Sequence, residues 1–254
     1  MLVGGMPQAV AAFAEGKDFG QADYVKQQII NLYRADMDAQ EEENPTYVTN
    51  FFDRIPSELS KHDKRYVLSH VDPNARIRDY RGPIRWLEEA MVANIASNVD
   101  DPSVAFNLGV VDPSFKCYLM DTGLLVSLAY RDRPYLENEL YKAILLDKLH
   151  VNEGMIVENA VAQALRTEGH ALFFYRKADR DTRKTAMEVD FLVRQGAKVC
   201  PVEVKSGGSR SLKSLRRFKE AFGNKVGASY VLHAGEIKRD EETVFLPYYM
   251  ASML

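Results

Sequence analysis

The sequence has few cysteines, no long apolar run and no excess of basic residues. Cys117 and Cys200 are its only cysteines, too few for a disulfide framework or a four-cysteine zinc site, and we expect two small buried side chains in a reducing cytosol. No stretch approaches the roughly 20 uninterrupted apolar residues of a membrane-spanning helix, so we expect a soluble, cytoplasmic protein with no membrane partner. The 33 lysine and arginine residues against 36 aspartate and glutamate residues give a net charge of −3, which is not the basic signature of many nucleic-acid binders.

A phosphate-binding loop is also missing. The stretch Glu15-Gly16-Lys17-Asp18 is similar to the end of such a loop, but Ala11 stands at the first glycine position and Asp18 replaces the required serine or threonine. We therefore expect no ATP site in this chain. The five histidines show no metal-ligand spacing, so they are expected to be structural or exposed.

The length of 254 residues fits one large or two modest domains, and we expect two. The apolar pattern divides the chain into three segments. Residues 1–44 are expected to form two helices that end in an acidic turn from Asp36 to Glu43. Residues 45–130 have helical periodicity over 47–59 and 76–91 and two short strand-like runs, which is the outline of a winged helix. The candidate recognition helix, 76–91, has a small excess of arginine, which leaves DNA contact and packing between domains equally open.

Residues 131–254 have a different composition, with a helix over 153–168 followed by runs rich in β-branched and aromatic residues. The expected order is helix, three strands, helix and strand, which predicts a mixed sheet flanked by helices. The fold class is therefore α/β (α+β), with an N-terminal helical and winged-helix portion followed by this mixed sheet.

Acidic residues interrupt two of the predicted strands. Val189-Asp190-Phe191-Leu192-Val193 and Val202-Glu203-Val204-Lys205 are apolar enough for a core, yet each carries charge that is costly to bury unless it is paired or bound to a metal. A hairpin between the strands brings Asp190 near Glu203, and two carboxylates repel unless a cation lies between them. Oxygen ligands favour a hard ion, Mg²⁺ or Mn²⁺. A structural interpretation stays open, in which Glu203 and Lys205 form an ion pair and Asp190 caps a bulge.

Two further glutamates belong to the same prediction. Glu158 shares one helix face with Val161 and Leu165, so we expect it to point inward. Glu188 lies on the same strand face as Asp190 and is a further candidate, expected to contact the ligands of the ion rather than the ion itself.

Basic residues concentrate around the predicted site. Residues 170–220 hold 13 lysine and arginine residues against 6 aspartate and glutamate residues, although the whole chain is acidic. A surface that neutralises phosphates binds nucleic acid in a strongly salt-dependent way, whereas the alternative is a solvated cationic face. The candidate nucleic-acid contacts lie in a loop and on a helix that border the site: Arg180, Arg183, Lys184, Lys213, Arg216, Arg217 and Lys219.

The ordered set of Glu158, Glu188-Val189-Asp190-Phe191 and Glu203-Val204-Lys205 resembles the PD-(D/E)xK nuclease superfamily in residue type and order. Four stretches resemble the bacterial and archaeal family in which an AAA-type ATPase domain precedes a C-terminal domain of unknown function: Gly4-Gly5-Met6-Pro7, residues 115–125, Glu158-Asn159 and Val202-Glu203-Val204-Lys205-Ser206. This resemblance spans nearly the whole chain.

The resemblance implies a restriction-endonuclease-like module in residues 131–254, with residues 1–44 as a remnant of, or linker from, an ATPase domain that would precede Met1. It also implies roles for the site residues. Asp190 and Glu203 would hold the divalent ion, Glu158 and the carbonyl of Val204 would be further ligands, and Lys205 would orient the attacking water or stabilise charge on the phosphate.

The leading hypothesis is thus a metal-dependent nuclease-like protein that hydrolyses phosphodiester bonds of nucleic acid, expected to be DNA. The alternative is a catalytically inactive module that binds nucleic acid or protein and regulates an attached ATPase. A purely structural partner is a third hypothesis, and it predicts no salt-dependent binding of nucleic acid.

Overall fold

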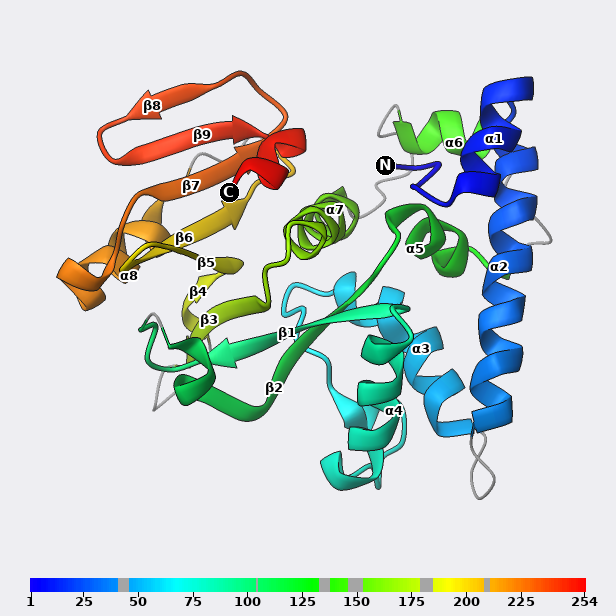
Figure 1. Cartoon of the computed structure of the whole chain (residues 1–254), viewed down its shortest axis with the longest axis horizontal. Coiled ribbons are helices and arrows are strands. Elements are labelled where there is room, and N and C mark those ends of the chain that lie inside the picture. The colour runs from blue at the N-terminus through cyan, green and yellow to red at the C-terminus, as the bar shows by residue number, and fades with distance from the viewer. Residues whose placement is uncertain (41–45, 104, 133–137, 146–152, 179–184, 208–210) are drawn as a thin grey trace. The chain divides into compact units, whose positions relative to one another are not determined.

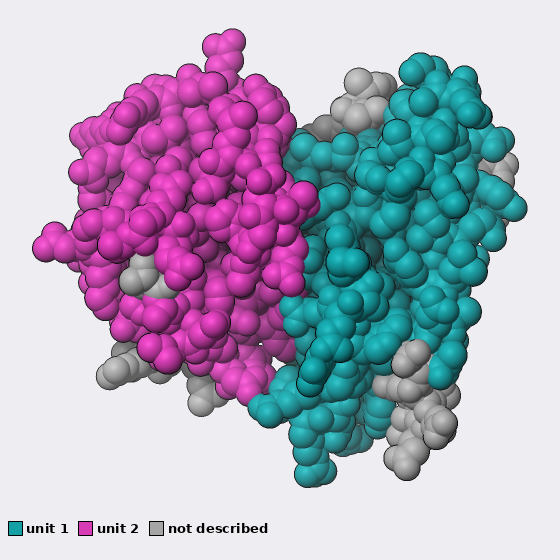
Figure 2. All heavy atoms as spheres, viewed as in Figure 1, with its two compact units in different colours: residues 1–94, 117–163 teal, residues 95–116, 164–254 magenta. Residues whose placement is uncertain are grey.

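The structure, a computed structural model, describes residues 1–40, 46–103, 105–132, 138–145, 153–178, 185–207 and 211–254 (Figure 1). The chain forms two compact units that alternate along the sequence. Unit 1 contains residues 1–94 and 117–163, and unit 2 contains residues 95–116 and 164–254, as the two colours of Figure 2 show. Helices and mixed sheets together give the predicted α/β class.

Unit 1 is built mainly from helices. Helix α2 packs against α1, α3, α5 and α6, whereas α4 packs against α3. Helix α2 continues through residues 36–40, where the sequence predicted a turn, because the side chain of Met37 is completely buried and anchors its last turns. The helices are α1 (Pro7–Gly16), α2 (Phe19–Gln40), α3 (Thr46–Leu59), the 3₁₀ helix η1 (Leu68–His70), α4 (Ile77–Glu89), α5 (Thr122–Ala129), α6 (Asn138–Leu145) and most of α7 (Glu153–Thr167).

Asp121 joins the N-terminal segment to the start of helix α5. Its Oδ1 accepts a hydrogen bond from the backbone N–H of Leu124 at 2.8 Å, and its Oδ2 accepts one from the N–H of Gly5 at 2.5 Å. Gly4 has a φ of +84°, and a Cβ there would overlap the Asp121 carboxylate. A Cβ on Gly123 would overlap the backbone of the N-terminal segment. Gly4 and Gly123 are therefore needed because the two motif stretches that contain them contact each other directly.

A buried polar cluster ties helix α2 to the same junction. The Nζ of Lys26 donates to the carbonyl oxygen of Leu2 at 3.0 Å and to the hydroxyl of Tyr141 at 2.5 Å, and it lies 3.7 Å from Asp23. The hydroxyls of Ser127 and Tyr141 donate to Asp23 at 2.5 and 3.0 Å. Burial lowers the pKa of Lys26 to about 8, although Asp23 opposes this shift. The hydrogen bonds of this cluster stabilise the ion pair of Lys26 and Asp23, whose burial would otherwise carry a large desolvation penalty.

Unit 2 is built around two mixed sheets, and the two strands of residues 93–119 belong to one of them. Its helix α8 (Lys213–Phe222) buries Leu215 and Phe218 and packs against strands β4 and β6. The strands are β1 (Ala93–Val99), β2 (Val110–Leu119), β3 (Leu172–Ala178), β4 (Thr185–Val189), β5 (Phe191–Gln195), β6 (Lys198–Val204), β7 (Ser229–His233), β8 (Lys238–Asp240) and β9 (Thr243–Pro247). The 3₁₀ helices η2 (Phe106–Gly109), η3 (Gly223–Lys225) and η4 (Tyr248–Met253) complete the described elements.

The strand order is β2-β1-β3-β4 in one sheet and β5-β6-β7-β9-β8 in the other. Strands β3 and β4 are antiparallel, as are β5 and β6, whereas β6, β7 and β9 run parallel. The chain order from α7 through β3, β4 with β5, β6, α8 and β7 is the predicted one. Strands β8 and β9 were not predicted, because they are short and β8 consists of three exposed charged residues.

Strand β1 pairs in parallel with β3. It therefore belongs to a larger sheet, whereas the sequence suggested only a small hairpin of β1 and β2. Its residues are buried on both faces, as is typical of an interior strand with a neighbour at each edge. The winged-helix interpretation of residues 45–130 stays a prediction.

Cys117 and Cys200 are buried free thiols, as predicted, and burial raises the pKa of both. None of the described helices combines the length and the hydropathy needed to cross a membrane.

Candidate functional site

Asp190 lies between β4, an edge strand of the first sheet, and β5, an edge strand of the second sheet. Phe191 pairs with Val202 in the antiparallel β5–β6 hairpin, so one further step of this register places Asp190 opposite Glu203. The backbone N–H of Val204 donates to Asp190 Oδ2 at 2.8 Å. The structure thus places the two acidic residues at facing backbone positions.

Lys205 accompanies this pair. Its Nζ lies 2.6 Å from Glu203 Oε1, and its carbonyl oxygen accepts a hydrogen bond from the hydroxyl of Tyr248. The exposed fractions of the Asp190, Glu203 and Lys205 side chains are 17%, 12% and 21%. These partly desolvated charges are paired, as the cost of burial requires.

Lys116 also lies at this site, although it was not among the predicted residues. Its completely buried Nζ lies 3.0 Å from Glu188 Oε1, 3.7 Å from Asp190 Oδ1 and 5.0 Å from the centre of the Phe174 ring. Arg176 adds a second positive charge, 3.8 Å from Glu188. A lysine inside the apolar stretch 115–119 was the available signal, because a buried charge there needs a partner just as Asp190 does.

The donor set fits a hard divalent ion. Asp190 and Glu203 offer carboxylate oxygens from adjacent strands, and the carbonyl of Val204 is a third oxygen of the same segment. Within the described ranges, no three His, Cys, Asp or Glu side chains gather closely enough to hold an ion by themselves. Mg²⁺ commonly completes such a two-carboxylate site with water and substrate phosphate.

Glu158 is buried on α7, as its helical position predicted. It belongs to unit 1 and has partners there: the hydroxyl of Tyr118 donates to its Oε1 at 2.6 Å, and Lys64 forms an ion pair with its Oε2. The side chain of the next residue, Asn159, accepts a hydrogen bond from the N–H of Leu119 at 2.9 Å and donates one to the Leu119 carbonyl oxygen at 3.1 Å. The Glu158-Asn159 pair therefore fixes the end of strand β2 within unit 1, a contact that no local sequence pattern predicts.

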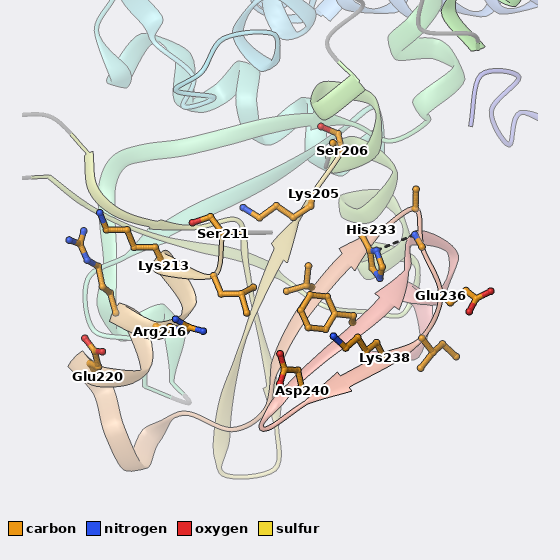
Figure 3. A pocket seen from close by; sticks show the side chains of 18 residues that line it. Lys205, Ser206, Ser211, Lys213, Arg216, Glu220, His233, Glu236, Lys238 and Asp240 are labelled. Atoms are coloured by element: carbon orange, nitrogen blue, oxygen red, sulfur yellow. Dashed lines mark hydrogen bonds between the residues drawn. The ribbon is translucent and has the colours of Figure 1, made fainter. Parts of the chain in front are cut away.

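A groove of about 1440 Å³ in unit 2 begins at Lys205. Three of the predicted nucleic-acid contacts, Lys213, Arg216 and Arg217, line it (Figure 3). Lys219 is not among the lining residues and pairs with Glu242 instead. Arg180, Arg183 and Lys184 lie outside the described residues. The structure thus assembles part of the predicted basic surface around one concave site.

The lining residues that were not predicted include Lys238 and His233. Lys238 enters the groove from the unpredicted strand β8, and His233 ends the parallel strand β7. The Nδ1 of His233 accepts a hydrogen bond from the N–H of Gly235 at 3.1 Å, which leaves the proton of the neutral ring on Nε2. That Nε2 is buried and has no hydrogen-bond partner among the described residues.

Comparison with known proteins identifies two family models. Residues 1–135 match a domain of unknown function, DUF8612, and residues 153–250 match another, DUF4143. DUF4143 is commonly associated with AAA-type ATPases, which agrees with the resemblance drawn from the sequence, but neither description indicates a PD-(D/E)xK nuclease module. No curated protein and no solved structure matches the chain.

Proposed function

We propose that this chain, which belongs to the DUF8612 family of domains of unknown function, is a metal-dependent phosphodiesterase of the PD-(D/E)xK type that hydrolyses nucleic acid. The observation that carries the proposal is the placement of Asp190 opposite Glu203, with Lys205 bonded to Glu203 and lining a groove with basic side chains. Carboxylates, a lysine and a phosphate-attracting surface are the groups that phosphodiester hydrolysis needs.

Each residue has a defined task in this reaction. Asp190 and Glu203 would hold Mg²⁺ or Mn²⁺ with the Val204 carbonyl, and such an ion supplies Lewis-acid stabilisation of the phosphate and a more nucleophilic water. The hydrogen bond from the Val204 N–H fixes the orientation of the Asp190 carboxylate. Lys205 orients the water or donates to the phosphate oxygen on which negative charge develops. Glu158, already bonded to Tyr118 and Lys64, stays a predicted ligand only.

A second candidate function is an inactive module that binds nucleic acid or protein and regulates an attached ATPase. The ion pairs of Lys116 with Glu188 and of Lys205 with Glu203 favour it, because lysines already neutralise the acidic residues. The common association of DUF4143 with AAA-type ATPases supports the regulatory partner.

The test is cleavage of labelled DNA and RNA, single- and double-stranded, in Mg²⁺, Mn²⁺ or EDTA. The native chain is compared with Asp190→Asn and Lys205→Ala. Metal-dependent cutting that both substitutions abolish would establish the phosphodiesterase. Salt-dependent binding by all three proteins, with no cutting by any of them, would contradict catalysis and support the binding module.

A further inference from the structure

We propose that the groove at Lys205 binds single-stranded nucleic acid, with strand β8 and helix α8 supplying opposite walls. This inference rests on the proposed function, because Lys205 belongs both to the predicted catalytic set and to the groove lining. It adds that the substrate is single-stranded and that Lys238 and Ile237, which no sequence motif indicates, contact it.

The dimensions of the groove favour an extended ligand. Its volume of about 1440 Å³ exceeds the roughly 300–1,000 Å³ of most small-molecule sites. Its lining comes from the end of β6, from α8, from the end of β7 and from the β8–β9 hairpin, all within unit 2. A chain of several nucleotides fits such a space better than a single small molecule does.

The charges of the groove favour a polyanion. Five basic side chains line it, against the acidic Glu220, Glu236 and Asp240. Of the basic ones, Lys213, Arg216 and Lys238 are exposed and form no ion pair with any residue that the structure describes. Figure 3 shows Arg216 and Lys238 extending toward the space between them from opposite sides. Unpaired cations on a concave surface concentrate the field that attracts phosphates.

Apolar side chains in the same groove favour a single strand over a duplex. Ile237 is 61% exposed, although it is a large aliphatic residue, and the partly buried Phe245 belongs to the same lining. Unpaired bases can cover such side chains while their phosphates contact the cations. In a duplex the base faces are stacked on one another and are not offered to the protein.

Strand β8 provides a matched pair of positions for the test. Lys238 and Asp240 line the groove, whereas Arg239 between them does not, because successive side chains of a strand point to opposite faces. The substitutions Lys238→Ala and Arg239→Ala therefore remove the same charge from adjacent exposed positions, only one of which faces the groove.

The experiment measures binding of the full chain to labelled oligothymidylate, oligouridylate and a DNA duplex in EDTA, as a function of salt. We expect both single strands to bind more tightly than the duplex. Lys238→Ala should weaken single-strand binding and reduce the salt slope by about 0.7, the value of one phosphate contact, whereas Arg239→Ala should change neither. Ile237→Ser should weaken binding without changing the slope, because an apolar contact releases no counterions.

Equal effects of Lys238→Ala and Arg239→Ala, or duplex binding as tight as single-strand binding, would overturn the inference. Because EDTA prevents metal-dependent cleavage, these results are independent of catalysis. Intact groove binding without cleavage in Mg²⁺ would contradict only the phosphodiesterase, whereas cleavage with equal effects of the two β8 substitutions would contradict only the groove.

Discussion

The ammonium group of Lys116 lies 3.0 Å from the carboxylate of Glu188 and is completely removed from solvent. Asp190, 3.7 Å away, is its second acidic neighbour. Lys116 therefore supplies positive charge to the same acidic residues that we propose lie at or beside a divalent ion. Loss of one member of a buried ion pair is costly, because the remaining charges stay removed from water and no longer have the opposite charge that offset this desolvation penalty.

Lys116→Met should lower the free energy of unfolding by about 3 kcal/mol, because Glu188 and Asp190 are left without their buried cation. Urea denaturation measures the loss. The control is Lys177→Met, which removes an exposed lysine from strand β3 and should cost little. Mn²⁺ should then raise the Tm of Lys116→Met more than that of the native chain. Equal losses in the two variants would show that Lys116 has no special electrostatic role.

Gly4→Ala should destabilise unit 1 by about 2 kcal/mol, because the new Cβ displaces the Asp121 carboxylate that caps helix α5. The positive φ of Gly4 adds strain. Thermal unfolding compares this variant with Gly16→Ala, whose Cβ would meet only the Cβ of Asp18 at an ordinary 3.6 Å. If Gly4→Ala proves as stable as Gly16→Ala, the contact between the two motif stretches is unimportant.

Lys26 should make stability depend on pH in the alkaline range. Its pKa in the folded chain, about 8, lies below the ordinary value of 10.5, so the unfolded chain binds more protons between these two values. The contribution of Lys26 to the free energy of unfolding therefore rises with pH, by about 2 kcal/mol between pH 8 and 10. Lys26→Met should lack this increment. Urea denaturation of both proteins at the two pH values provides the comparison, and parallel changes would disprove the shift.

The sequence predicted the features that depend on segments close to each other along the chain. The juxtaposition of Asp190 and Glu203 follows from one hairpin, whose strands are apolar except at the charged positions. Burial of Glu158 follows from helical spacing on α7. The fold class and the element order from α7 to β7 follow from the same periodicities.

The missed features depend on distant segments or on short polar elements. Lys116 belongs to β2, far in sequence from Glu188, so only the fold shows which carboxylates it compensates. Lys238 lies on a strand of three charged residues, which has no apolar alternation to detect. The contact of Gly4 with Asp121 joins two loops, and loop geometry is not encoded by periodicity.

Phosphodiester hydrolysis at Asp190 and Glu203 is tested most directly by the single-turnover rate of single-strand cleavage in Mg²⁺ by the native chain, Glu203→Gln and Glu220→Gln. Glu203 is a proposed ligand of the ion, whereas Glu220 is an exposed carboxylate in the groove lining. We expect Glu203→Gln to lower the rate at least about 100-fold, since a metal ligand stabilises the transition state by several kcal/mol, and Glu220→Gln to change it little. A native rate no faster in Mg²⁺ than in EDTA, or equal rates for all three proteins, would contradict hydrolysis at this site.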